Sequence, residues 1–201
     1  MSSSNSFPVS EKVALTGQAQ DEKSRKIYEV FLSFRGEDTR ESFTKLLFDF
    51  LRMARIHVFM DDHSIQRGDH ISTSLLRAIK QSQISIIVFS RNYANSRWCL
   101  DELVKIMECH RTIGQIVLPV FYDVDAFDVL HQTGEFGKSF QSLLSRTSEE
   151  EDASLKWRDT LCDAANLPGF VVQNIRYEQC YLFFFFFTKA TLVVTPLPQV
   201  D

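Results

Sequence analysis

The segment from Ile84 to Met107 restricts the possible folds of this chain more than any other. It starts with a nearly continuous run of β-branched and aromatic residues, which is typical of a strand buried on both faces of a parallel sheet. In the stretch that follows, apolar residues recur at helical spacing, namely at Leu100, Leu103, Val104 and Met107. We therefore expect a central strand followed by a helix that packs on the sheet.

Two side chains near the start of this helix lie off the apolar stripe. Trp98 and Glu102 are one helical turn apart, so they share a face just beyond the carboxyl end of the expected central strand. Ligands of open α/β sheets bind at the carboxyl ends of the strands. The sequence therefore predicts a site here, with Glu102 on an exposed helix face where its replacement changes stability little.

Strand and helix patterns alternate along the rest of the chain. The expected strands are residues 28–34, 56–60, 84–89, 115–122 and a short fifth strand at 170–172, with helical periodicity between them. Because Pro119 has no N–H group, we expect the fourth strand at the margin of the sheet. The alternation predicts an α/β fold with a five-stranded parallel sheet and helices on both faces.

Composition divides the chain into three parts. Residues 1–26 have the polar composition of a disordered leader, 27–176 form the expected domain, and 177–201 contain five consecutive phenylalanines. The phenylalanine run allows three interpretations: a membrane tail, an extension of the fifth strand, or a sequence not selected to fold, such as a truncation product. We favour the third, and expect no stable membrane anchor, because a span needs roughly 20 apolar residues.

Charge and cysteine content narrow the function classes. The net charge of −4 and the absence of a basic field make nucleic acid an unexpected partner. Four cysteines without paired spacing, and no secretory signal, favour a reduced, cytoplasmic setting. The five histidines lack metal-ligand spacing, so neither a metal nor a cofactor is expected.

Polar and aromatic residues follow several of the expected strands. Right-handed crossovers put all carboxyl ends of a parallel sheet at one edge, so residues distant in sequence meet there. An indole ring can stack on a base, arginines can bind phosphates, and a carboxylate can face a ribose. The residues at this edge, Arg35, Gly36, Arg67, Gly68, Trp98 and Glu102, therefore indicate a nucleotide site.

Two longer motifs carry a specific resemblance. Residues 33–40 (SFRGEDTR) and 98–103 (WCLDEL), together with 61–71 and 115–125, closely resemble the TIR (Toll and interleukin-receptor) domain of plant immune receptors. The resemblance covers residues 27–173 and implies a flavodoxin-like fold. It also implies an NAD⁺-cleaving enzyme whose assembled form makes nucleotide signals for cell death, with NAD⁺ as substrate.

The resemblance also implies roles for individual residues. It makes Glu102 the catalytic glutamate and residues 61–70 a mobile loop used in assembly. The expected substrate contacts are Phe34, Arg35, Gly36, Arg67, Gly68, Ser96 and Trp98. The expected protein partners are TIR domains of other immune receptors or a second copy of this chain.

A single carboxylate is chemically sufficient for this reaction. Ordinary glycosidases need two, because their leaving group must be protonated. The nicotinamide of NAD⁺ already carries a positive charge and leaves as a neutral molecule. One glutamate can then orient the ribose hydroxyls and stabilise an oxocarbenium-like transition state.

Three departures from the family pattern keep a second function class open. Lys45-Leu46 replaces a frequent Ser-His pair in the first helix, and Asp125-Ala126-Phe127 replaces Asp-Pro-Ser, with Leu130 where arginine is common. The last amphipathic helix, which both family assembly surfaces use, is missing after Arg176. The chain, which we do not expect to be a complete receptor, is therefore either an NAD⁺ nucleosidase that needs association or a non-catalytic TIR adaptor or decoy.

Two other features resemble sites but are better explained otherwise. The segment from Gly134 to Ser139 looks like a phosphate loop, yet it has two residues between its glycines where the motif requires four. Cys99 has no histidine placed by the sequence to activate it, so we expect a buried, small apolar side chain rather than a nucleophile.

Overall fold

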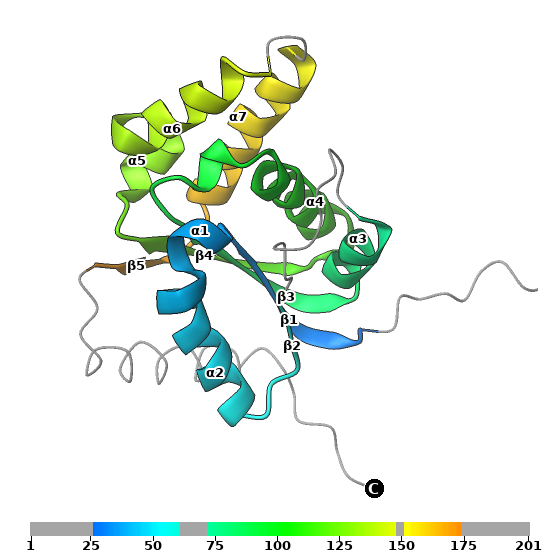
Figure 1. Cartoon of the computed structure of the whole chain (residues 1–201). Coiled ribbons are helices and arrows are strands. Elements are labelled where there is room, and N and C mark those ends of the chain that lie inside the picture. The colour runs from blue at the N-terminus through cyan, green and yellow to red at the C-terminus, as the bar shows by residue number, and fades with distance from the viewer. Residues whose placement is uncertain (1–25, 61–71, 148–150, 174–201) are drawn as a thin grey trace, which may run out of the picture.

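The computed structural model describes residues 26–60, 72–147 and 151–173. Its five strands form one parallel sheet in the order β2-β1-β3-β4-β5 (Figure 1). The strands are β1 (Tyr28–Phe34), β2 (Val58–Met60), β3 (Ser82–Phe89), β4 (Ile116–Tyr122) and β5 (Phe170–Val172). This arrangement confirms the predicted α/β fold and puts β1 and β3, where the strand order reverses, at the centre.

Helices and helical turns connect the strands. They are α1 (Gly36–Thr39), a π-helical turn η1 (Arg40–Thr44), α2 (Lys45–Met53), α3 (Thr73–Lys80), a 3₁₀ turn η2 (Tyr93–Asn95), α4 (Arg97–Ile113), α5 (Ala126–His131), α6 (Gly134–Leu144) and α7 (Glu151–Ala165). Serine caps begin two of them, since the Ser72 hydroxyl accepts from Leu75 N–H at 3.2 Å and Ser96 from Cys99 N–H at 3.3 Å. Gly114, at φ +68°, ends α4.

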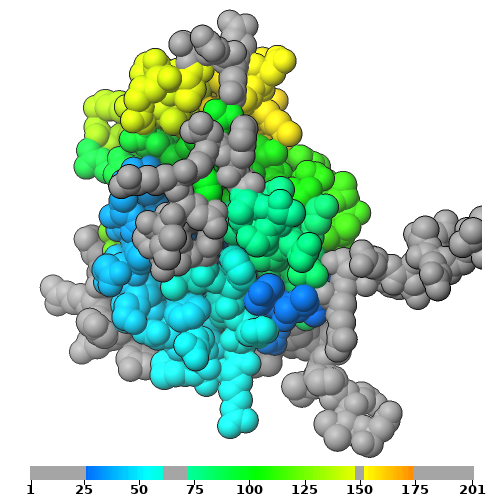
Figure 2. All heavy atoms as spheres, turned by 45° about the vertical axis from the view of Figure 1, so that its right-hand side comes forward, coloured from blue at the N-terminus to red at the C-terminus, as the bar shows by residue number. Residues whose placement is uncertain are grey.

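The two faces of the sheet carry separate apolar cores. Alternate residues of β1 point to opposite faces, so Phe31 packs toward α3 and α4, while Val30 and Leu32 pack toward α2. Helices α6 and α7 extend the first side (Figure 1), and the space-filling view shows them above the part of the surface formed by α2 (Figure 2). The residues that matter below lie on the α3 and α4 side.

The position of β4 corrects one expectation. β4 lies between β3 and β5 rather than at the margin, and Pro119 is in register with Ile87. β5 is short, and its ladder with β4 begins only at Val120, one residue after the proline. Gly169 lets the chains approach closely there, because a Cβ would lie 2.7 Å from the Pro119 carbonyl oxygen. A short neighbour thus accommodates a proline inside the sheet.

Several expectations fall on residues outside the described ranges. These are the leader up to residue 25, the loop at 61–70 with Arg67 and Gly68, and the phenylalanine run. The domain limits at residues 27 and 176 therefore stay predictions. Within the described ranges, no helix combines the length and the apolar character that a membrane crossing requires.

Candidate functional site

Glu102 is completely buried, which corrects the expectation of an exposed side chain. Its exposed fraction is 0%, and its Oε2 accepts a hydrogen bond from the Ser33 hydroxyl at 2.8 Å. Helix α4 packs on β1 and β4 and also contacts α3 and α7, so its buried face is wider than the predicted stripe. That face includes Cys99, Leu100, Glu102, Leu103, Ile106, Met107 and Cys109, whereas Val104 is only half-buried.

Tyr93 extends the hydrogen bonding around Glu102. Its phenol oxygen lies 2.9 Å from the Ser33 hydroxyl oxygen and 3.0 Å from the Cys99 carbonyl oxygen. The ring is fully buried edge-on against Phe89, with centroids 5.1 Å apart. Burial, with smaller contributions from nearby Cys99 and Glu102, raises the pKa of Tyr93 well above its usual range. The phenol therefore keeps its proton and can donate it to a hydrogen bond.

Cys99 connects the start of α4 to the end of β1. Its Sγ lies 3.6 Å from the Phe34 carbonyl oxygen, to which the thiol donates. Burial, reinforced by Glu102, raises the pKa of this thiol far above its usual range. A neutral thiol buried to 3% exposure confirms the expectation of a packing residue rather than an activated nucleophile.

Asp38 joins the loops that follow the two central strands. Its carboxylate accepts hydrogen bonds from the Ser90 hydroxyl at 2.6 Å and from the Asn92 backbone N–H at 2.9 Å, and Asn92 Nδ2 also donates to it at 3.2 Å. On its other side, Asp38 Oδ1 lies 3.5 Å from Arg35 Nε. The turn after β1 and the loop after β3 are therefore tied together at the carboxyl edge of the sheet.

Arg35 and Trp98 lie near this edge, as expected. Arg35 immediately precedes α1 and pairs with Glu37 as well as Asp38, so its guanidinium is already compensated by two carboxylates. Trp98 is half-buried in the first turn of α4, one turn before Glu102. For Arg35 to bind a phosphate, the phosphate would have to replace the exposed Glu37.

Three other expected contact residues have structural roles in this state. The Phe34 side chain, 1% exposed, packs on the α2 face under the Arg40 guanidinium, away from Glu102. A strand sends successive side chains to opposite faces, so the Phe34 side chain lies on the other face of the sheet from Ser33, and its expected substrate contact stays a prediction. Ser96 caps α4, and Gly36 is the first residue of α1.

Ser33, Tyr93 and Asp38 are not among the site residues predicted from the sequence. Ser33 did leave a signal, since it is a polar residue inside the run from Val30 to Phe34, where both faces of a central strand are buried. Tyr93 and Asp38 left none, because their partners are distant in sequence and become neighbours only in the folded chain.

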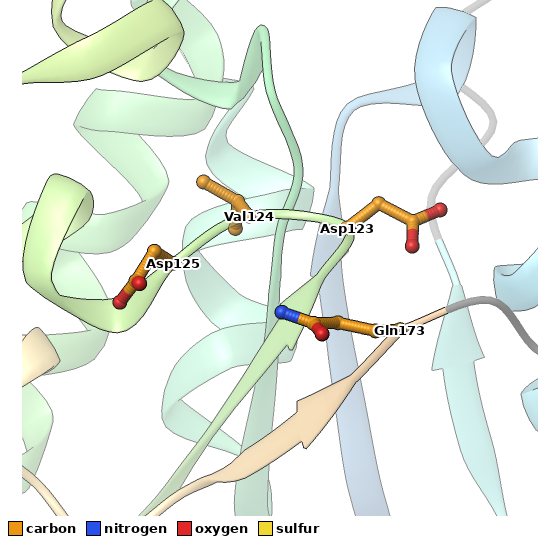
Figure 3. Close-up of a pocket in the computed structure, with 4 residues that line it drawn as sticks. All are labelled: Asp123, Val124, Asp125 and Gln173. Carbon is orange, nitrogen blue, oxygen red and sulfur yellow. The ribbon is translucent and has the colours of Figure 1, made fainter.

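The part of the same carboxyl edge that follows β4 and β5 is built differently. Asp123, Val124, Asp125 and Gln173 line an open, shallow pocket, and the two carboxylates do not point toward one another (Figure 3). Asp125 instead caps α5, accepting from the Phe127 N–H at 2.8 Å. In the described part of the chain, no group of three or more His, Cys, Asp and Glu side chains is arranged to bind a metal.

Comparison with known proteins assigns the family. The model of the TIR domain matches residues 27–182. Disease resistance protein RPV1 of Vitis rotundifolia is 50% identical over 151 residues, or 75% of this chain and 10% of RPV1. TMV resistance protein N of Nicotiana glutinosa is 48% identical over 146 residues, or 73% of this chain and 13% of that protein.

A solved structure agrees with this assignment. The TIR domains in the structure of the activated Roq1 resistosome, which directly recognises the pathogen effector XopQ, superpose with a TM-score of 0.70 at 44% identity. The alignment covers 81% of this chain and 98% of that chain. The chain spans only 10–13% of the length of the two disease resistance proteins above. By sequence and by fold, this chain belongs to the TIR-domain family.

Proposed function

We propose that this chain is an NAD⁺ nucleosidase that acts in plant immune signalling. The observation that supports this most directly is the buried carboxylate of Glu102, bonded by a hydroxyl at the carboxyl ends of the two central strands. A buried carboxylate with fixed donors is preorganised, so it stabilises developing positive charge without first reorganising water. The resemblance to NAD⁺-cleaving plant TIR domains gives that chemistry its substrate.

The reaction requires little from the protein besides this charge. The bond between C1′ of the ribose and the nicotinamide nitrogen breaks, and the electron pair leaves with the neutral nicotinamide. Water adds to C1′ and releases one proton, which gives ADP-ribose. Glu102 orients the ribose hydroxyls and stabilises the oxocarbenium-like transition state, while Trp98 stacks on a ring and Arg35 binds a phosphate.

Complete burial of Glu102 adds a condition to this proposal. A ribose can reach a side chain with 0% exposure only after the surrounding residues move. The activated Roq1 resistosome is an assembly that contains TIR domains. We infer that contact with another TIR domain, from a second copy of this chain or from a receptor, supplies the rearrangement. Activity should then depend on protein concentration or on the partner.

A non-catalytic role as a TIR adaptor or decoy is the second candidate, and Lys45 is the observation that favours it. Lys45 occupies a position where the family often has serine, and its ammonium pairs with Asp49 of the same helix at 3.1 Å. The side chains of Lys45 and Asp49 are 59% and 50% exposed, so water screens the pair and Asp49 neutralises Lys45 only weakly. Two α2 helices meeting symmetrically would bring these lysines together and weaken self-association.

Nicotinamide release by the purified full chain tests the first candidate against the second. The rate is measured over a range of protein concentrations, alone and with an intact TIR receptor, and light scattering reports association in the same samples. We expect release that grows faster than protein concentration, or that requires the receptor, and that is lost in Glu102→Gln. Association with the receptor but no release in either sample would contradict the enzyme and leave the adaptor.

A further inference from the structure

Three oxygen–oxygen contacts connect Glu102 to the backbone of its own helix through two hydroxyl groups. Glu102 Oε2 is 2.8 Å from Ser33 Oγ, Ser33 Oγ is 2.9 Å from the Tyr93 phenol oxygen, and that oxygen is 3.0 Å from the Cys99 carbonyl oxygen. All three contacts are buried. Each contact needs one hydrogen, but the two hydroxyls supply only two.

The direction of these bonds depends on the protonation of Glu102. When Glu102 is ionised, the two hydrogens serve only two of the three contacts: Ser33 donates to the carboxylate, and Tyr93 donates either to Ser33, which we call the first arrangement, or to the Cys99 carbonyl. When Glu102 carries a proton, it can donate to Ser33, which then donates to Tyr93, which donates to the Cys99 carbonyl. That carbonyl lies inside α4 and has a helical N–H partner four residues on, so it tolerates the first arrangement.

We propose that Ser33 and Tyr93 are positioning residues for Glu102, and that their hydroxyls form a relay whose hydrogens all point toward the carboxylate when it is ionised. The catalytic meaning of this relay rests on the proposed function. Its effect on Glu102 does not, because a hydrogen bond donated to a carboxylate is stronger than one accepted from the protonated acid. The relay therefore favours the ionised form of Glu102.

The other titratable groups around the site fit this role. From η2 and from the start of α4, Tyr93 and Cys99 face Glu102, and burial raises the pKa of both, so both are neutral. From the turn after β1, Arg35 and Asp38 act on Cys99 and pair with one another. The ionised form of Glu102 thus has neutral groups among its neighbours, and the Ser33 hydroxyl donates to it directly.

Both relay oxygens belong to rigid parts of the fold. Ser33 is in β1, which is hydrogen-bonded to strands on both sides, and Tyr93 is packed against Phe89 of β3. A carboxylate bonded to such a pair has a fixed orientation in addition to a fixed charge. Neighbouring Ser85 of β3 offers a matched control, because it is equally buried on the same face but its hydroxyl has no partner in the described part of the chain.

The direct test measures the pKa of Glu102 in the full chain. Glutamate labelled with ¹³C at the side-chain carboxyl reports the titration by NMR, and the signal that disappears in Glu102→Gln belongs to Glu102. Ser33→Ala should raise the pKa of Glu102 by about one to two pH units, since a hydrogen bond to a charged group is lost. Tyr93→Phe should raise it by less, and Ser85→Ala should leave it unchanged.

The outcomes separate the relay from the enzyme. A pKa of Glu102 that stays at the wild-type value in Ser33→Ala, or that moves as far in Ser85→Ala, would overturn the relay. If Ser33→Ala does not fold, Tyr93→Phe applies the same test, because it removes only the phenol oxygen. With an active enzyme, the acid limb of nicotinamide release should move with the measured pKa. A shifted pKa without any release in the wild type would refute the proposed function and leave the relay standing.

Discussion

The helices that follow β3 and β4 start in the same way but differ in depth. Both α4 and α5 begin in the connection that follows a strand, directly after a residue whose side chain caps the helix. Helix α4 has 17 residues and buries seven of them, including Glu102, whereas α5 has six residues and buries only Val129. The carboxylate of Asp125, at the start of α5, remains exposed.

This difference shows that a place at the carboxyl edge of the sheet does not by itself make a reactive site. An exposed carboxylate is solvated by water, which must reorganise when charge develops nearby. A buried carboxylate depends on fixed donors, because leaving it unpaired would be costly. We therefore propose that the reaction takes place at the part of the carboxyl edge near β1 and β3. The carboxylate near β4 serves only to cap a helix. The predictions below test that division.

The largest expected effect concerns core packing under the two helices. Leu103 of α4 is 0% exposed, and Leu103→Ala should lower the free energy of unfolding by roughly 2–5 kcal/mol through the cavity it leaves. Phe127 of α5 is 61% exposed, so Phe127→Ala should change it by at most about 0.5 kcal/mol. Urea unfolding of both variants measures the difference, and equal losses would mean that α5 is as deeply packed as α4.

Charge removal in these two parts of the carboxyl edge should affect the rate of nicotinamide release very differently. Glu102→Gln preserves the shape of the side chain but removes its charge, and should slow nicotinamide release about 100- to 1,000-fold. Asp125→Asn, a matched loss of one charge that retains the capping oxygen, should leave the rate at the wild-type value. The rates are compared with the same TIR partner present. A slow Asp125→Asn variant would show that the part of the edge near β4 also contributes to the reaction, against our proposal.

Removing the cap of α4 or of α5 should lower stability by a similar amount, but only the cap of α4 should affect activity. Ser96→Ala and Asp125→Ala each remove an acceptor for a backbone N–H, so each should lower the free energy of unfolding by about 0.5–2 kcal/mol. Only the first frays the turn that carries Trp98, so only Ser96→Ala should also reduce nicotinamide release. If both substitutions reduce the rate equally, the region around α5 also contributes to the reaction.

The smallest expected effect lies on the surfaces of α4 and of α6, the helix that follows α5. A hydrogen bond from Lys105 lowers the pKa of Glu108 on α4, and one from Lys138, with a second from Arg91, lowers the pKa of Glu135 on α6. A lowered folded-state pKa adds stability above the unfolded-state pKa, and this stability is lost as pH falls through the folded-state value.

The matching variants are Glu108→Gln and Glu135→Gln. Each should melt slightly below the wild type near neutral pH, and the gap should close as pH falls below the lowered folded-state pKa values, where both carboxyls are protonated in either state. Added salt should also narrow the gap, because these side chains are about half-exposed. A gap that survives low pH would show that the side chains act through packing rather than charge.

Much of the fold could be predicted because hydrophobic periodicity is local information. The strands at Tyr28–Phe34 and Phe170–Val172 were predicted to the residue, and the strand between Ser82 and Phe89 to within two. The short helix α5 was missed because it has only one buried residue and hence no apolar period. Pro119 led to a wrong position for β4, because the sequence around Pro119 does not reveal how short the neighbouring strand β5 is.

The position of several candidate site residues in the fold could be predicted from the sequence, but their surroundings could not, and their roles stay predictions. Motif wording pointed to Glu102, Arg35 and Trp98, and the fold does place them near the same edge. The burial of Glu102 could not be inferred, because its partner Ser33 is distant in sequence and because α4 contacts α3 and α7 as well as the sheet. For the same reason, the expected indifference of stability to replacing Glu102 no longer holds. Replacing a side chain of 0% exposure changes a packed interior.

Asp38 gives the two central loops a shared mechanical behaviour. One carboxylate accepts hydrogen bonds from Ser90 and Asn92 after β3 while facing Arg35 after β1. A displacement of either loop therefore acts on the other through the Asp38 side chain, so we expect the two loops to move together. An inserted residue in one loop would break the match with the other, and chains that vary here would have to vary both loops together.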